Sequence, residues 1–124
     1  MAASFGALRR HAASLPGATR DIKWGADECY SVGGKMFAVF GIENGRERGM
    51  SIKVEPERFL ELTDIDGVVP APYLARARWV KFERADVLPA TDVKALIARS
   101  HALIAAKLTR AVREAVLSTA PRGK

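Results

Sequence analysis

The stretch ECYSVGGKMFAVFGIENGRERGMSIKV, residues 28–54, decides the fold class. Two runs rich in β-branched and aromatic residues, 28–32 and 35–42, are joined by Gly33-Gly34. A two-residue glycine connection suits the hairpin turns that need positive φ. A third run, 50–54, alternates apolar and polar residues, which is the pattern of a half-buried strand. The stretch therefore predicts three consecutive antiparallel strands.

Alternation within the hairpin predicts which side chains share a face of the sheet. One face should carry Tyr30, Val32, Phe37 and Val39, and the other should carry Cys29, Ser31, Met36, Ala38 and Phe40. Both sets are apolar. We therefore expect one face to pack on helices and the other to be partly covered.

Helical patterns lie on both sides of these strands. Residues 3–14 repeat apolar side chains every three or four positions and end before Pro16-Gly17. A short helix begins at Glu55-Pro56-Glu57, where proline suits the first turn. The longest helix is expected over residues 91–117, capped by Thr91 or Asp92.

The remaining segments are shorter and less regular. Residues 16–25 read as a loop, with Ile22 and Trp24 packed beneath it. Two prolines in residues 68–74 exclude a central strand there. Residues 77–84 predict a strand with Trp79 and Lys81 on one side and Arg78, Val80, Phe82 and Arg84 on the other. Gathered strands with helices at the ends predict an α+β two-layer sandwich.

Length and composition limit the class of protein. The chain has 124 residues, 48% hydrophobic and 27% charged, as an average single globular domain has. We expect one domain over residues 1–117 and a flexible tail over 118–124. No apolar run is long enough to span a bilayer, and the N-terminal arginines follow the apolar residues, unlike a secretory signal. With a single cysteine, these features favour the cytoplasm.

The net charge of +6 is concentrated in the two terminal segments. Such asymmetry favours a polyanionic partner, first nucleic acid and then an acidic membrane surface, although a modest positive charge also serves solubility alone. We expect DNA as the partner, no membrane association and a monomer. Arginines and lysines at a hairpin tip and at strand ends are the candidate DNA contacts: Arg46, Arg48, Lys53, Arg76, Arg78 and Lys81.

Three further arginines, Arg99, Arg110 and Arg113, fall on one side of the long predicted helix and form a secondary basic face. The alternative is a protein- or small-ligand-binding module that uses an uncovered sheet face around Tyr30, Phe37 and Trp79. Mixed charge at strand ends is also common on an ordinary solvated rim.

Nothing in the sequence predicts an enzyme, a cofactor or a metal site. No phosphate-binding loop, dinucleotide fingerprint, nucleophile elbow or zinc-protease motif is present. Cys29 lies within a predicted strand, where a buried structural role is expected. His11 and His101 stand alone on their helices, without further ligands at metal-binding spacing.

Seven short segments occur together in one order: SLPGAT (14–19), WG (24–25), VGGKMFAV (32–39), IKVEPER (52–58), VPAPYL (69–74), WV (79–80) and SHALIAAKL (100–108). With them the chain resembles the MmcQ/YjbR family of small bacterial proteins over about residues 4–110. The resemblance implies a CyaY-like fold, a twisted antiparallel sheet with helices on one face. It also implies the family's label, a non-enzymatic "double wing" DNA-binding protein whose hairpins contact DNA.

Two departures from the family pattern follow Leu74. Where the family pattern has Asn-Lys and then a histidine before the tryptophan, this chain has Ala75-Arg76 and Arg78, which keep the basic character. The iron chemistry of frataxin-like relatives of the fold does not transfer, because it needs an acidic ridge of oxygen ligands.

Overall fold

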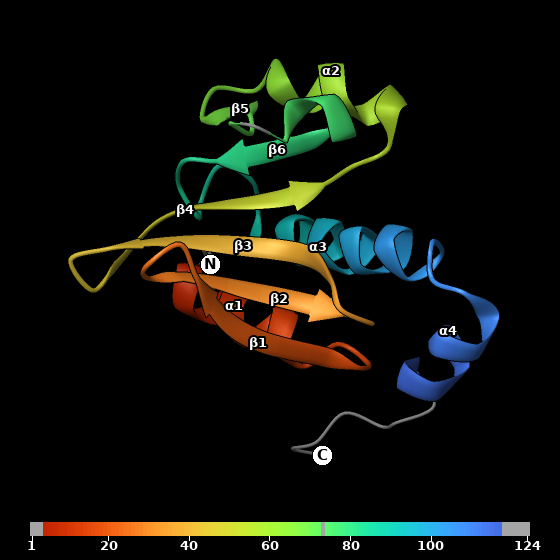
Figure 1. Cartoon of the computed structure of the whole chain (residues 1–124). Helices are drawn as coiled ribbons and strands as arrows, with labels where there is room; N and C mark the ends of the chain where they lie inside the picture. Colours follow the sequence, from red (N-terminus) through yellow and green to blue (C-terminus); the bar gives the residue numbers. More distant parts are fainter. Residues whose placement is uncertain (1–3, 73, 118–124) are drawn as a thin grey trace.

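Six antiparallel strands form one twisted sheet in the order β1-β2-β3-β4-β6-β5 in the computed structural model, which describes residues 4–72 and 74–117 (Figure 1). The elements are α1 (Phe5–Ala13), β1 (Ala18–Lys23), β2 (Asp27–Val32), β3 (Lys35–Glu43), β4 (Arg46–Lys53), α2 (Pro56–Thr63), β5 (Val68–Pro70), the 3-10 turn η1 (Ala75–Ala77), β6 (Trp79–Phe82), α3 (Ala90–Ala105) and α4 (Arg110–Leu117). Helices α1 and α3 lie on the same face of the sheet and contact its central strands. The predicted α+β sandwich is confirmed.

The face of the sheet covered by α1 and α3, here called the inner face, carries the core. Ala38, Ile52 and Val80 lie side by side across β3, β4 and β6, and all three are fully buried. The next row across the same strands is Phe40, Met50 and Phe82, also fully buried. Val80 and Phe82 therefore supply the buried side of the strand predicted over residues 77–84.

A β-bulge changes the predicted faces of the first hairpin. Tyr30 lies opposite Ala38 and Ser31 lies opposite Met36, so Phe37 is an extra residue in β3. Tyr30 and Phe40 consequently share the inner face, with ring centroids 5.7 Å apart, although simple alternation separates them. Val39 lies beside Cys29 on the opposite, outer face.

Ser100 of α3 satisfies the backbone at the bulge. Its hydroxyl donates to the Phe37 carbonyl oxygen at 2.7 Å and accepts from the Lys53 N–H at 3.0 Å. The Ser100 side chain is fully buried. One hydroxyl therefore joins α3 to the interior of β3 and the end of β4.

The prediction of a loop over residues 16–25 is wrong, because residues 18–23 form edge strand β1. Ile22 and Trp24 are not packed beneath it, since they are 45% and 67% exposed. Strand β1 has no apolar alternation that would reveal it. Its backbone pairs along the whole length of β2 instead.

The long helix predicted over residues 91–117 is two helices. Helix α3 ends at Ala105 and α4 begins at Arg110, with the Thr109 hydroxyl accepting the Val112 N–H at 3.3 Å. Such a side-chain cap starts a new helix without needing glycine or proline. At the other end, α3 begins at Ala90 and neither Thr91 nor Asp92 caps it. The short helix predicted from Pro56 is confirmed as α2.

The two edges of the sheet are short or charged. Strand β5 spans three residues and ends in Pro70, which has no N–H. Strand β1 exposes Arg20 and Asp21, and the Asp21 carboxylate accepts the Ile22 N–H at 2.8 Å.

No helix among the described residues is long and apolar enough to cross a membrane. The predicted tail, residues 118–124, lies outside the described residues.

Candidate nucleic-acid interface

The predicted DNA contacts divide between the two ends of the sheet. Strand β4 has Arg46 at its start and Lys53 at its end, about 20 Å apart along an extended strand. At the β3–β4 hairpin, Arg48 pairs with Glu43 at 3.2 Å, and Glu47 pairs with Arg9 at 2.9 Å. Arg48 of this predicted wing is therefore paired, and the wing carries two acidic residues beside its two arginines.

The opposite end of the sheet gathers cations. The Lys53 ammonium donates to the Ala77 carbonyl oxygen, beside Arg78. Burial lowers the pKa of Lys53, and the charges of Lys107 and Arg78 lower it further. Lys107 and Arg78 are therefore both close enough to Lys53 for their positive charges to act on it.

Arg78 is held in place by its backbone and its ring contact. It has φ +64°, which ends the η1 turn, and its guanidinium lies 5.6 Å from the centre of the Phe59 ring. The same guanidinium donates to the Arg76 carbonyl oxygen at 3.3 Å. A cation stacked on an aromatic face keeps its charge available to an anion.

Lys35 and Arg76 complete this group. Lys35 begins β3 at the end of the sheet where β4 finishes, and it follows the Gly33-Gly34 turn that packs against Leu108. The term "basic end" is used below for five side chains: Lys35, Lys53, Arg76, Arg78 and Lys107. Among residues 4–72 and 74–117, no carboxylate lies within ion-pair distance of any of them.

The other predicted basic residues lie elsewhere. Lys81 is on the outer face, opposite Ser51 of β4. Arg99 pairs with Glu55, and Arg110 pairs with Glu114 at 3.1 Å. Arg113 donates to the Ala106 and Leu108 carbonyl oxygens where α3 ends. Because α3 and α4 are separate helices, the secondary basic face is not one stripe.

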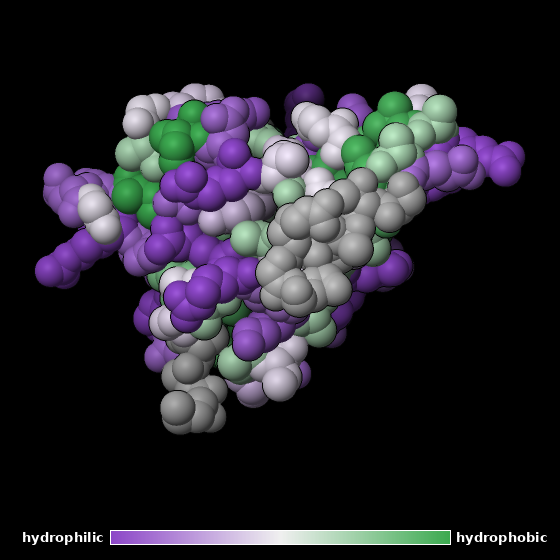
Figure 2. Space-filling view, turned by 90° about the horizontal axis from the view of Figure 1, so that it is seen from below, coloured by the Kyte–Doolittle hydropathy of each residue, from purple (hydrophilic) through white to green (hydrophobic). Residues whose placement is uncertain are grey.

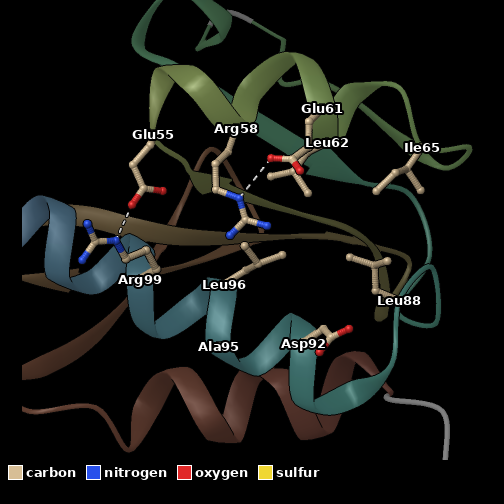
Figure 3. Close-up of a pocket in the computed structure, with 10 residues that line it drawn as sticks. All are labelled: Glu55, Arg58, Glu61, Leu62, Ile65, Leu88, Asp92, Ala95, Leu96 and Arg99. Carbon is tan, nitrogen blue, oxygen red and sulfur yellow. Dashed lines mark hydrogen bonds and ion pairs between the residues drawn. The ribbon is translucent and has the colours of Figure 1, made fainter.

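A cleft between α2 and α3 carries mixed charge (Figure 3). It has a volume of about 480 Å³ and a floor that includes Leu62 and Leu96. Arg58 pairs with Glu61 on α2, and Arg99 of α3 pairs with Glu55. Its arginines are therefore already matched by the protein's own carboxylates.

The outer face of the sheet has a hollow, but it is not at the residues predicted for the alternative function, a protein- or small-ligand-binding module. Tyr30, Phe37 and Trp79 are buried, so they form no exposed patch. A cavity of about 490 Å³ lies instead between the β1–β2 turn and the segment before η1. This outer-face hollow is lined by Trp24, Asp27, Met36, Val39, Ser51, Pro72 and Leu74.

Groups with catalytic or ligand potential are buried or half-buried and have structural contacts. Cys29 has no exposed surface, and burial raises the pKa of its thiol. The His11 and His101 rings each lie within hydrogen-bond distance of a backbone carbonyl oxygen, at Lys94 and Pro16. Within the described part of the chain, no three His, Cys, Asp or Glu side chains are grouped to hold a metal.

Seen from below, hydrophilic residues cover much of the surface between separate apolar areas (Figure 2).

The contacts predicted from the sequence include Lys53, Arg76 and Arg78 of the basic end, but not Lys35, Lys107 or the outer-face hollow. Lys107 directly follows the apolar pattern of α3, and only the packing of Leu108 on the β2–β3 turn brings it to the end of the sheet. The exposed Trp24 was assigned to the interior. In the structure it lies in the three-residue turn between paired Lys23 and Asp27, and the Gly25 that follows it is the local sign of a turn in the sequence.

Comparison with known proteins gives a family and a fold. The family model described as YjbR matches residues 13–103. The structure of the Deinococcus radiodurans protein DR2400, described as a DUF419 domain, is similar with a TM-score of 0.80 and 25% identity, over 97% of this chain and 93% of that one. A Pseudomonas syringae protein has a TM-score of 0.57 and 21% identity, over 70% of this chain and 86% of its own. No curated protein matches. The chain belongs to the YjbR family.

Proposed function

We propose that this protein binds DNA through the phosphate backbone, acts as a monomer in the cytoplasm and catalyses no reaction. One observation carries the proposal: five cations share one end of the sheet, and no described carboxylate pairs with them. Cations of a merely solvated surface usually alternate with acids, as they do at the β3–β4 hairpin. A group of cations without carboxylate partners in the described residues favours binding of an external polyanion.

The electrostatics of Lys53 support the same reading. Its pKa is lowered by burial and by the positive charges of Lys107 and Arg78. A phosphate placed among these groups would relieve their repulsion and raise the pKa of Lys53 again. Binding should therefore stabilise the protonated form of Lys53, which is the form that makes a charge-assisted hydrogen bond to phosphate.

The hairpin tip is less suited to phosphate contact than the basic end is. Arg48 is matched by Glu43, and Glu47 adds a negative charge beside Arg46. We therefore assign the main contact to the basic end and only a weak contribution to Arg46 and Arg48. Lys81 lies on the outer face, where it can extend the contact along the sheet.

The test is fluorescence anisotropy of a labelled random-sequence duplex, titrated with protein across a series of salt concentrations. Each phosphate contact contributes about 0.9 to the slope of log affinity against log salt, so five contacts predict a slope of about −4.5. The triple variant Lys53→Ala/Arg78→Ala/Lys107→Ala should reduce its magnitude to about 2.

Two matched variants control for charge alone. Lys94 lies on α3 about 20 Å along the helix direction from Lys107, and Arg48 lies at the other end of the sheet. Lys94→Ala and Arg48→Ala should each change the slope by less than the removal of one basic-end lysine. Equal losses from all sites would show a diffuse charge effect, and absent binding at low salt would reject DNA as the partner. Light scattering of the bound and free protein tests the monomer.

A further inference from the structure

We infer that the outer-face hollow accepts an unpaired base of single-stranded DNA while the basic end holds the adjoining phosphates. The inference rests on the proposed function and names the form of DNA that it favours. It is carried by an exposed aromatic ring, an apolar cavity with two hydrogen-bonding groups, and lysines on both sides of that cavity.

Trp24 provides the stacking surface. It is 67% exposed at the rim of the hollow, beyond the end of edge strand β1. Its backbone has φ +51°, an uncommon conformation for a bulky residue, and Gly25 follows at φ +91°. A tight turn thus presents the indole at the surface. Exposed aromatic rings beside cations are how proteins without sequence preference stack single-stranded bases.

The floor and far wall of the hollow suit the body of a base. Met36, Val39 and Ser51 come from β3 and β4, whereas Pro72 and Leu74 face Trp24 from across the sheet. The volume of about 490 Å³ lies within the roughly 300–1,000 Å³ that small-ligand sites occupy. A thioether and aliphatic groups would contact the flat faces and edges of a base.

Asp27 and Ser51 supply the polar contacts. Asp27 Oδ1 accepts the Ile42 N–H at 3.3 Å, which orients the carboxylate at the rim and leaves acceptor capacity on it. A carboxylate accepts hydrogen bonds only, so it favours bases with an exocyclic amino group and disfavours thymine, whose carbonyls flank its single N–H. The Ser51 hydroxyl can donate or accept. Cytosine should therefore bind better than thymine.

Lysines flank the hollow on the outer face of the sheet. Lys23 lies opposite Asp27, and Lys81 lies opposite Ser51, so both are on the outer face. The Lys81 side chain crosses Gly49, where a Cβ would come within 2.7 Å of its Cε. Lys53 follows Ser51 by two residues and is on the same face. A strand with its base in the hollow would therefore have lysines along its backbone.

The experiment compares labelled (dC)12, (dT)12 and a 12-bp duplex at one salt concentration. Expected results are tighter binding of (dC)12 than of (dT)12 or duplex, and quenching of tryptophan emission that is lost in Trp24→Phe. Trp24→Ala should weaken (dC)12 binding roughly 5- to 150-fold, the range for one stacked base, and leave the duplex affinity unchanged. Asp27→Asn should remove the preference for cytosine over thymine.

Ile22→Ala is the matched control, because Ile22 is an exposed apolar residue of β1 opposite Glu28 on the inner-face side. It should leave all three affinities unchanged, and the unchanged duplex affinity of Trp24→Ala reports that the variant is folded. If Trp24→Ala and Asp27→Asn bind (dC)12 as the wild type does while the basic-end triple variant loses both forms, the base site is refuted and the phosphate contact stands. Absent binding of every probe at low salt refutes both.

Discussion

Replacing Ser100 by alanine should destabilise the protein, although Ser100 lies among the buried apolar residues of α3, where alanine would fit the pattern. The Ser100 hydroxyl is fully buried and makes two hydrogen bonds to backbone groups, the Phe37 carbonyl and the Lys53 N–H. Phe37 is the extra residue of the β-bulge, and Lys53 is the last residue of β4. Both backbone groups lose this partner when the hydroxyl is removed.

The size of the effect follows from the two backbone groups left without partners. Each unsatisfied buried group costs about 1–3 kcal/mol, and partial relaxation or entry of water recovers some of it. A loss of about 2–4 kcal/mol is therefore expected for Ser100→Ala. In a chain of this size each kcal/mol lowers Tm by about 3–5 °C, so Tm should fall by roughly 6–20 °C.

Calorimetry and urea unfolding at neutral pH measure the loss directly. Ser31→Ala is the matched control, because Ser31 is also nearly buried and its hydroxyl makes no hydrogen bond with a described group. The control should change the free energy of unfolding by less than about 1 kcal/mol. A Ser100→Ala protein whose Tm lies within about 2 °C of the wild-type Tm would refute the role assigned to this hydroxyl, because the expected fall is well above that limit. An equal loss in the control would do the same.

Three further predictions concern other parts of the fold. Gly33→Ala should destabilise by about 2–4 kcal/mol in urea unfolding, because its φ is +59° and its Cβ would come within 2.6 Å of Leu108; Gly34→Ala, also at positive φ but in open space, should cost only about 1 kcal/mol, and equal losses would contradict the packing argument. The hydrogen bond from Arg20 is the main cause of the lowered pKa of Glu28. Glu28 therefore stabilises the folded state at pH values above the ordinary glutamate pKa, near 4.3. Glu28→Gln should therefore cost about 1 kcal/mol at pH 7, and calorimetry should show the difference from wild type shrinking as pH falls from 5 to 3; a difference constant with pH would rule out this ion pair as its source. Cys29 should react with iodoacetamide at least about 100-fold more slowly in the native protein than in urea, because its buried thiol has a raised pKa; equal rates would show an accessible thiol.

The central strands could be predicted because local signals agree there. Glycines at the first turn, alternation over residues 50–54 and proline at the start of α2 each act within a few residues. The faces of Val80 and Phe82 followed from alternation alone, since β6 has no bulge in its pairing with β4. Strong local patterns of this kind need no knowledge of the partner strand.

The errors come from contacts that are distant in sequence. The bulge at Phe37 depends on Ser100, 63 residues later in the chain, which takes the carbonyl that the ladder leaves free. Strand β1 forms by pairing with β2 and has almost no buried side chains, so its sequence shows no strand period. The end of α3 depends on a threonine cap that resembles many helix-interior threonines.

The candidate site was predicted in part for the same reason. Arg76 and Arg78 are neighbours in sequence, and alternation along β4 directs Lys53 outward. Lys107 joins them only through the packing of Leu108 against Gly33. The hairpin arginines were predicted as contacts because the sequence shows the charges of Arg48 and Glu43 but not that the two side chains pair with each other.

The two edges of the sheet also bear on how copies of this protein behave when crowded. An open edge strand can add a strand from another molecule, which begins aggregation or amyloid growth. Here Pro70 removes a donor from β5, and the Asp21 carboxylate already occupies the Ile22 N–H of β1. Charged Arg20, Asp21 and Lys23 further oppose the approach of a second strand. Both edges therefore disfavour strand addition between molecules, and replacing Asp21 by valine would open the longer edge to it.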